Sequence, residues 1–458
     1  MQGELQIPKF VIDLSQPPEA RYAHIIPHFR EQVDSCDLPG LFHDLLCQLA
    51  GRRRGKCLGV ISRLALRRLF MAEESAELVG ISKASGIPMH ILVAFNVILD
   101  LLLGCTSGGA RTLDPGNSAP NLPTRMLHFR TLDWGMDQLR EIIVELDFVR
   151  SHGGPVIATT VTYLGYVGVL TGVRKGLSMS LNFRPTHARN SWRQRASFRW
   201  QQALVVLGFR RSISSVLRGF LLEPPSAKNG GESKSGKRIT RSEKDIEEVH
   251  DDYMQAILSN LSTSPSTAAY LIFCTSDKIF IVQKDHHHAS VRVSDTFLTA
   301  YNHDADAEID SEQPQPSLDE TVPDVAPDAA PDTTPAVAAD IVIDIASDDG
   351  TGFGSSVPST NSESGIGMSD ILNLSLERKC TLDEMWARQV KACQQLYGQQ
   401  EEAVTLDDVK LFLDDEDISN EETHYAVIMD PTVGKVLWRR AYEVDDDGYS
   451  CSDDSDDN

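Results

Sequence analysis

The chain has 458 residues, of which 41% are hydrophobic, and a formal net charge of −23 at pH 7. This hydrophobic share is ample for a large core and excludes a wholly disordered chain. The acidic excess argues against nucleic-acid binding, which needs clustered Lys and Arg. Acidic residues without any Lys or Arg fill positions 304–349, whereas the balance turns basic between Cys105 and Arg218. We therefore expect a less negative folded unit flanked by acidic segments.

The eight cysteines, at positions 36, 47, 57, 105, 274, 380, 393 and 451, form no CxxC pair. This spacing favours free thiols in a reducing compartment. The first 20 residues lack the basic and apolar regions of a signal peptide. The apolar run over 90–104 has 15 residues and includes Asn96 and Asp100, whereas a spanning helix needs about 20 apolar residues. We expect no transmembrane segment and a cytoplasmic location, or a lysosomal or vacuolar one if an upstream segment is missing.

The first part of the chain predicts a short strand and then helices. Residues 10–22 look like a strand followed by a Pro-Pro turn. Apolar spacing is helical from Ile25 to Ala84. Gly80 and Gly86 are expected to break that helix, and Pro88 to begin the next.

After Cys105 the apolar pattern changes to a period of two. This pattern over 140–150, 155–172 and 176–185 predicts antiparallel strands joined by short turns such as Ser151 to Gly154. A helical stretch over 195–222 and a polar, mobile loop over about 223–244 should follow.

The last third predicts a helix over 251–266 and a buried hairpin over 268–285. Residues 303–369 have the composition of a disordered acidic linker, and 444–458 form an acidic tail. Between them, 370–443 should hold a helix, with Thr381 and Glu384 as its capping box, and a closing hairpin. Because a lone hairpin is marginal in water, we expect it to dock on the earlier sheet.

The stretch "CTSGGA" begins at Cys105, which the residues alone leave open as a packing residue, a metal ligand or a nucleophile. A nucleophilic thiol needs a base and donors for the oxyanion. If the chain is cut before Cys105, the new α-amine has a pKa of about 8 and can be that base. Arg130 and Asp133 follow on the next predicted strand, where they are also compatible with a surface ion pair. Three apart, they face opposite sides of a regular strand, so one shared site requires a bend.

The segments "CTSGGA", "HFRTLDWG", "GYVGVLTG" and "GLSMSLNFRP" together resemble the family of acid ceramidase and N-acylethanolamine-hydrolysing acid amidase. These are N-terminal-nucleophile, choloylglycine-hydrolase-like amidohydrolases. The resemblance implies an α+β fold, an αββα sandwich of two antiparallel sheets between helical layers. It implies an α-subunit or pro-region over 1–104 and a catalytic β-subunit over 105–302, both from one precursor, with 370–443 completing the catalytic domain.

The resemblance also implies roles for single residues. Cys105 matches the nucleophile, Arg130 and Asp133 its charged partners, and Asn182 an oxyanion donor, although Asn182 could equally be a turn residue. Three further positions, Tyr166, Ser276 and Asn302, are candidates for support of the substrate or the site. No metal or other cofactor is implied.

Three positions depart from the family pattern: Phe183 stands where the ceramidase branch has Glu, Ser276 where Asn is expected, and His286 where Arg is expected. The run His286–His288 has no metal-ligand spacing and is expected to be an exposed polar loop. The favoured function is hydrolysis of a lipid amide such as ceramide. Hydrolysis of an N-acylethanolamine or bile-salt-like amide, and a non-catalytic lipid-binding relative, are the alternatives.

Overall fold

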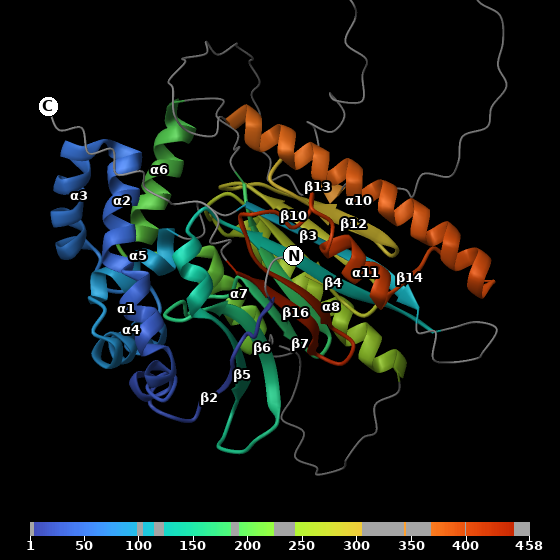
Figure 1. The fold of residues 1–458 in the computed structure, drawn as a ribbon, viewed down its shortest axis with the longest axis horizontal. Coiled ribbons are helices and arrows are strands. Elements are labelled where there is room, and N and C mark those ends of the chain that lie inside the picture. The colour runs from blue at the N-terminus through green and yellow to red at the C-terminus, as the bar shows by residue number, and fades with distance from the viewer. Residues whose placement is uncertain are drawn as a thin grey trace, which may run out of the picture.

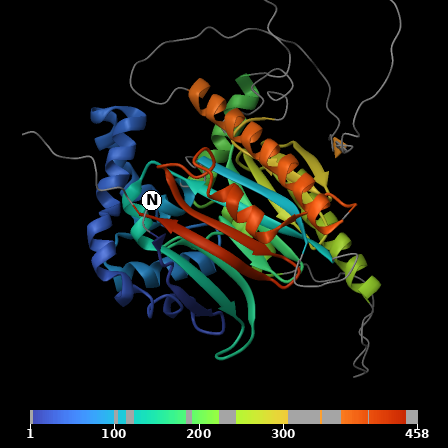
Figure 2. The same ribbon diagram turned by 45° about the vertical axis from the view of Figure 1, so that its right-hand side comes forward.

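In the computed structural model, the described residues are 4–98, 104–113, 123–184, 192–223, 243–304, 343–344, 368–398 and 400–443. The predicted mobile loop, acidic linker and acidic tail lie outside this part of the chain, apart from their edges and a two-residue strand at 343–344. Two β-sheets stack on one another between layers of helices (Figures 1 and 2). This is the αββα arrangement expected from the resemblance.

The first sheet carries the start of the predicted β-subunit next to the end of the chain. Its order is β1 (Glu4–Leu5), β16 (Lys435–Tyr442), β15 (Thr423–Asp430), β4 (Thr124–Asp133), β3 (Gly104–Leu113) and β12 (Phe297–Ala300), with β14 (Val404–Thr405) beside β3. Strand β15 pairs antiparallel along β4. The expected docking of the closing hairpin is therefore confirmed.

The second sheet has nine strands. Its order is β13 (Ile343–Asp344), β11 (Ala289–Ser294), β10 (Ile279–Lys284), β9 (Ala269–Cys274), β8 (Leu177–Phe183), β7 (Thr171–Arg174), β6 (Val156–Tyr163), β5 (Ile143–Val149) and β2 (Lys9–Asp13). The expectation of purely antiparallel sheets is wrong at two places, because β2 pairs parallel with β5 and β14 pairs parallel with β3. Both strands come from distant parts of the chain, and only such long connections permit parallel pairing.

One helical group lies beside the sheets in Figure 1 and holds most of the N-terminal segment. It comprises η1 (Pro18–Ala20), η2 (Ile26–Phe29), α1 (Arg30–Cys36), α2 (Leu38–Ala50), α3 (Arg52–Ala65), α4 (Ala72–Ser85), α5 (Met89–Ile98) and α6 (Trp192–Val206). The remaining helices are η4 (Asp137–Ile142), α7 (Ile213–Leu222), α8 (Glu243–Thr263), α10 (Met368–Tyr397) and α11 (Leu406–Leu413). Among the described residues, no helix combines the length and apolarity needed to cross a membrane.

Two local predictions are corrected by packing. Helix α4 runs through Gly80 and ends at Gly86, whose φ is +82°. A Cβ at Gly80 would lie 2.0 Å from the carbonyl oxygen of Glu19, so this glycine lets α4 approach η1 closely. Helix α10 begins at Met368 and passes straight through Thr381, so the predicted capping box there is wrong. The apolar stripe of α10, buried on the first sheet, continues the helix across that position.

Side chains along β3 and β4 alternate between the two faces of the first sheet. Arg130 and His128 point toward the second sheet, where they contact β8. Leu127 and Phe129 point the other way and pack under α10 and α11. Cys105 faces the second sheet with Arg130, which places it between the two sheets.

Candidate active site

Cys105 is the second residue of β3 and is fully buried. Its Sγ accepts a hydrogen bond from Nη2 of Arg130 at 3.1 Å, and its backbone N–H donates to Oδ1 of Asn302 at 3.0 Å. Burial raises the pKa of the Cys105 thiol, and the charge of Arg130 opposes that rise. In this uncut chain Cys105 therefore holds a protonated thiol next to a group that would stabilise its thiolate.

Arg130 is fully buried, and its other contacts fix the guanidinium in place. Nη2 also donates to the carbonyl oxygen of Leu181 at 2.9 Å, and Nη1 donates to the hydroxyl of Thr171 at 2.6 Å and to the carbonyl oxygen of Leu170. None of these partners of Arg130 within the described chain is a carboxylate. A surface ion pair with Asp133 is therefore excluded, and the guanidinium charge is directed at the sulfur.

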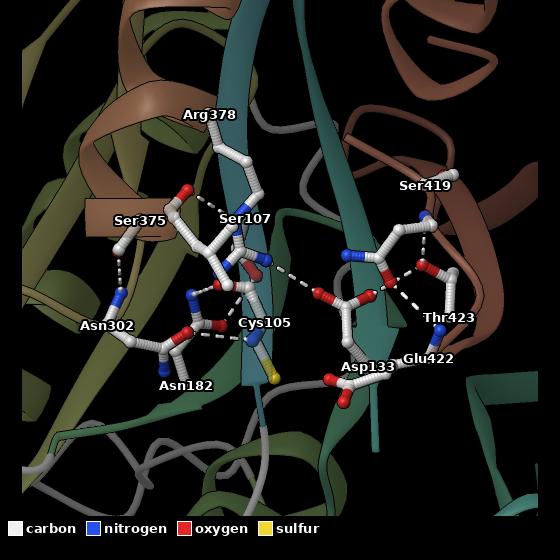
Figure 3. Close-up of polar contacts among 12 residues, drawn as sticks. Cys105, Ser107, Asp133, Asn182, Asn302, Ser375, Arg378, Ser419, Glu422 and Thr423 are labelled. Atoms are coloured by element: carbon white, nitrogen blue, oxygen red, sulfur yellow. Dashed lines mark hydrogen bonds and ion pairs between the residues drawn. The ribbon is translucent and has the colours of Figure 1, made fainter. Parts of the chain in front are cut away.

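Asp133 is the last residue of β4 and lies opposite Gly104 in the strand register. Its carboxylate pairs with Nη1 of Arg378 at 2.7 Å and accepts a hydrogen bond from the Thr423 hydroxyl at 2.8 Å. Figure 3 shows the Cys105 sulfur directed away from this ion pair. The bend that one shared site would require is absent from β4, which keeps a continuous register with β3; the register shift lies on the β15 side, between Thr423 and Tyr425.

Asn182 and Asn302 hold the backbone around Cys105 from two strand ends. Nδ2 of Asn182 donates to the carbonyl oxygens of Ala300, at 3.0 Å, and of Cys105, at 3.4 Å, while Oδ1 accepts from the Ser107 hydroxyl at 2.7 Å. Asn182 is a buried residue of β8 and not a turn residue. Both predicted asparagines are thus brought to the nucleophile candidate.

The remaining predicted positions lie elsewhere. Tyr166 belongs to the same hydrophobic core as Cys105 and packs edge-to-face on Phe95 of α5, with ring centroids 5.9 Å apart. The carbonyl oxygen of Ser276 accepts from the backbone N–H of Met126, near the far end of β4, about 20 Å along the strand from Cys105. His286 contacts Ser197 of α6 at 3.1 Å and is only partly exposed, whereas His287 and His288 are exposed. Ser276 and His286 are not part of this site.

Helix α10 supplies two residues that sequence reasoning missed. Besides Arg378, the buried Ser375 accepts a hydrogen bond from the Asn302 backbone N–H at 3.0 Å. Arg378 stands four and seven residues before Leu382 and Met385 of the buried stripe of α10. A cation in line with an apolar helix stripe is the sequence signal that could have identified it, because a buried charge needs a partner.

A small apolar pocket of about 40 Å³ lies between α2, α5 and the residues that follow β4. Its lining is Leu38, Leu41, Phe42, Leu45, Ile91, Ala94, Phe95, Trp134, Met136 and Leu139. Trp134 directly follows Asp133 in the chain. Its lining suits an apolar group and offers almost no hydrogen-bonding groups.

The three interpretations of Cys105 can now be compared. Within the described residues no group of three His, Cys, Asp or Glu side chains is arranged to hold a metal ion, and the Arg130 guanidinium beside Cys105 would repel one. A packing thiol needs no cation and no asparagines around it. A thiol beside a guanidinium that has no carboxylate partner among the described residues, with two asparagines on the adjoining backbone, is an arrangement that a nucleophilic cysteine would need.

Sequence comparisons find acid amidases and acid ceramidases among the proteins that this chain resembles. The family model for the beta subunit of N-acylethanolamine-hydrolyzing acid amidase matches residues 6–69, in the segment for which we predicted the α-subunit. The N-acylethanolamine-hydrolyzing acid amidase of Caenorhabditis elegans is 31% identical over 193 residues, 40% of this chain and 49% of that protein. Rat acid ceramidase is 28% identical over 200 residues, 39% of this chain and 46% of that protein. The chain therefore spans about half the length of the curated relatives it matches.

One solved structure, the Caenorhabditis elegans N-acylethanolamine-hydrolyzing acid amidase ortholog, matches with a TM-score of 0.39 and 16% identity, over 72% of this chain and 93% of that one.

Proposed function

Since this chain is related to the acid ceramidase and N-acylethanolamine-hydrolyzing acid amidase family, we propose that it hydrolyses the N-acyl amide bond of a lipid such as ceramide. Cys105 is the nucleophile, exposed as an N-terminal residue when the chain cleaves itself after Gly104. The observation that carries the proposal is the 3.1 Å contact between the Arg130 guanidinium and the buried Cys105 sulfur. No metal or other cofactor takes part in this reaction.

The self-cleavage begins with the Cys105 sulfur. Sγ attacks the carbonyl carbon of Gly104, a C–S bond forms as the C–N bond breaks, and the thiol proton passes to the released nitrogen. Water then hydrolyses the thioester and leaves a carboxylate on Gly104. Arg130 supports the step because its charge favours the thiolate. The uncut chain is inactive on lipid amides, because its Cys105 nitrogen is a peptide N–H bonded to Asn302.

Turnover uses the new α-amine as the base, with a pKa of about 8. The amine takes the thiol proton, Sγ attacks the amide carbonyl of the lipid, and the amine returns the proton to the departing nitrogen. Water then releases the fatty acid from the acyl-thioester. Asn182 and a backbone N–H donate to the oxyanion. In the uncut chain the Asn182 side chain donates to carbonyl oxygens, among them that of Cys105. It must release them to donate to the oxyanion, which forms beside Cys105.

Asp133 is the residue that orients the amine. It lies across the strand pair from Gly104, so the carboxylate is beside the new terminus once Gly104 is released. Arg378 and Thr423 each hold one of its two oxygens and fix its direction. Arg378 is therefore a positioning residue for the proposed reaction.

The proposal assigns the acyl chain of the substrate to the apolar pocket lined by Trp134, whose walls must move apart to admit it. Its walls carry aromatic and aliphatic side chains, so burial of an alkyl chain there is favourable by about 0.8 kcal/mol for each CH₂ group. The proposal therefore favours a long-chain amide over a bile-salt-like one. Ceramide and N-acylethanolamines share this acyl chain and differ in the amine that leaves.

Mass spectrometry of the purified chain tests the proposal together with a substrate panel. We expect a fragment that begins at Cys105, and fatty acid release from ceramide or an N-acylethanolamine only by the cleaved form. Hydrolysis of a conjugated bile salt in preference to both lipids would replace the substrate assignment. An intact chain that binds ceramide without releasing fatty acid would show the non-catalytic lipid-binding alternative to be right.

A further inference from the structure

Arg184 and Asp304 form a largely buried ion pair that the proposed reaction does not use. Nε of Arg184 donates to Oδ1 of Asp304 and Nη2 donates to Oδ2, each at 2.7 Å. The side chain of Arg184 is 8% exposed and that of Asp304 is 22% exposed. Two parallel hydrogen bonds between a guanidinium and a carboxylate fix both the distance and the relative orientation of the two groups.

Two strands of the second sheet keep this pair in place. The Tyr270 hydroxyl on β9 donates to Oδ1 of Asp304. Nη1 of Arg184 donates to the carbonyl oxygen of Lys284 on β10 at 3.3 Å. The Arg184 guanidinium also lies 5.8 Å from the centre of the Tyr270 ring. The pair is therefore attached to β9 and β10 as well as to its own two segments.

The two partners stand at the ends of strands from different sheets. Arg184 directly follows β8 of the second sheet, two residues after Asn182. Asp304 lies four residues beyond the end of β12 of the first sheet, two residues after Asn302. Each charged residue is thus two positions beyond an asparagine of the candidate site, and their ion pair joins the two sheets at that point.

The asparagine side chains bridge the same two segments. Nδ2 of Asn302 donates to the carbonyl oxygen of Phe183 at 2.8 Å, and Nδ2 of Asn182 donates to that of Ala300 at 3.0 Å. Each side chain therefore bonds the backbone of the segment that carries the other one, beside Cys105 (Figure 3). A shift of either segment would move both asparagines relative to Cys105, which they contact at its N–H and its carbonyl oxygen.

We propose that Arg184 and Asp304 are positioning residues, whose ion pair keeps the two segments at the spacing that places Asn182 and Asn302 around Cys105. This inference rests on the proposed function, in which Asn182 donates to the oxyanion. Burial of the two charges offsets much of their attraction, so the pair is better suited to fixing geometry than to adding stability. A misplacement of about 1 Å at such a site can slow an enzyme about 10²-fold, so loss of the pair should lower the rate.

The experiment combines the kinetics of fatty acid release, normalised to the fraction of chain cleaved before Cys105, with hydrogen exchange measured by mass spectrometry. Asp304→Asn keeps the size of the side chain and removes its charge. It should lower kcat about 10- to 100-fold and leave KM within about twofold, because the lost alignment matters in the transition state. Peptides that include β8 and residues 300–304 should exchange faster than in the parent.

Arg184→Gln and Arg184→Lys test the other partner of the pair. Lys keeps the charge but not the two parallel hydrogen bonds, so Arg184→Lys should retain more of kcat than Arg184→Gln. The double variant Arg184→Gln and Asp304→Asn should lose no more kcat than the more severe single variant, because the two residues act as one unit. If Arg184→Gln fails to fold, Arg184→Lys and Asp304→Asn still decide the question.

The matched control is Asp147→Asn on β5. Asp147 is buried and pairs with Lys9 at 2.8 Å, so the same substitution again breaks a buried ion pair. The control should lower the free energy of unfolding but leave kcat within about twofold, because it shares no partner with the candidate site. Exchange of residues 300–304 should stay as in the parent.

Two results would overturn the positioning role. One is a kcat for Asp304→Asn within about threefold of the parent, or a loss of the same size in Asp147→Asn, because the rate would then not depend on this pair in particular. The other is a low kcat without faster exchange of residues 300–304, since the segment would not have moved. Either result leaves fatty acid release by the parent intact. A parent chain that releases no fatty acid would instead refute the proposed function, while exchange would still show whether the pair holds the two segments.

Discussion

Both faces of the first sheet carry candidate site residues near the start of β3, but the residues of the two faces come from different parts of the chain. The inner face holds Cys105 and Arg130, which Asn182 approaches from β8 of the second sheet, and the guanidinium touches the sulfur. These three residues come from one stretch of the chain. The outer face holds Asp133, with partners from α10 and from the first residue of β15, both beyond the predicted linker. One face is local in sequence and the other is assembled from distant segments.

This difference suggests that the two faces serve different steps of the proposed reaction. The inner face contains what self-cleavage needs: the thiol and a charge that favours the thiolate. The outer face contains what turnover needs in addition, a carboxylate held in place for the new amine. Changes on the inner face should therefore stop both steps, and changes on the outer face should reduce turnover more than self-cleavage.

The largest effect is expected for Cys105→Ala, which removes the atom that both steps share. No fragment beginning at Cys105 and no fatty acid release should be found by mass spectrometry. Cys105→Ser should cleave slowly, since a hydroxyl can attack the preceding peptide, but turn over far less substrate. The control Cys274→Ala, fully buried on β9, should only lower stability, by about 1–3 kcal/mol. Normal cleavage and hydrolysis by Cys105→Ala would refute the nucleophile assignment.

The next effect concerns the charge on the inner face. Arg130→Gln should slow self-cleavage and lower kcat/KM by about 10² to 10³-fold, because a group that stabilises negative charge in the transition state is lost. Arg130→Lys keeps the charge without the forked contacts to Thr171 and Leu181 and should recover part of the rate. Time courses of cleavage and of fatty acid release measure both. If Arg130→Gln kept both rates within threefold of the parent, Arg130 would not be the group that stabilises the thiolate.

A smaller effect is expected on the outer face. Arg378→Gln should leave self-cleavage nearly unchanged and lower kcat about tenfold with little change in KM, because Asp133 loses its fixed direction. It should also lower the free energy of unfolding by up to about 3–5 kcal/mol, since one partner of a buried pair is removed. Arg378→Lys should restore most of the turnover by keeping the pair.

Lys379→Ala is the matched control, one residue further along α10 and paired with Asp383 near the surface. Steady-state kinetics of the cleaved forms, together with urea unfolding, separate the two roles. If Arg378→Gln abolished self-cleavage as Cys105→Ala does, the outer face would take part in self-cleavage. The assignment of the two faces to different steps would then be wrong.

The same contrast explains which parts the sequence could predict. Strands near Cys105 show a clear period of two, and motifs within one stretch of chain identified Cys105, Arg130, Asp133 and Asn182 as neighbours. The place of Arg378 in line with the apolar stripe of α10 marks it as a buried cation, but its pairing with Asp133 was not predictable, because pairing across the linker leaves no local pattern. The start of α10 was placed too late, since its first residues, before the apolar stripe, resemble the linker in composition. The subunit boundaries and the cytoplasmic location stay predictions.

The smallest effect concerns two buried histidines and the pH dependence of the free energy of unfolding. His128 on β4 bonds Ser178 and Ser180 between the sheets, and His424 on β15 bonds Tyr163. Burial lowers the pKa of each from 6.5 to about 3. Below pH 6.5 the unfolded chain therefore binds two protons that the folded chain does not. This contribution to stability is complete above pH 6.5 and is lost as the pH falls toward 3.

As the pH falls from about 7.5 to 5, each histidine should lower the free energy of unfolding by about 2 kcal/mol. Replacing one of them with a side chain that does not titrate should remove half of that pH dependence, even if the variant is less stable overall. His128→Gln tests the inner face and His424→Gln the closing hairpin, with the exposed His152→Gln as the control. Urea unfolding at the two pH values gives the difference for each variant. An unchanged pH dependence in His128→Gln would mean that His128 titrates normally in the folded chain, and that the region beneath Arg130 is open to water.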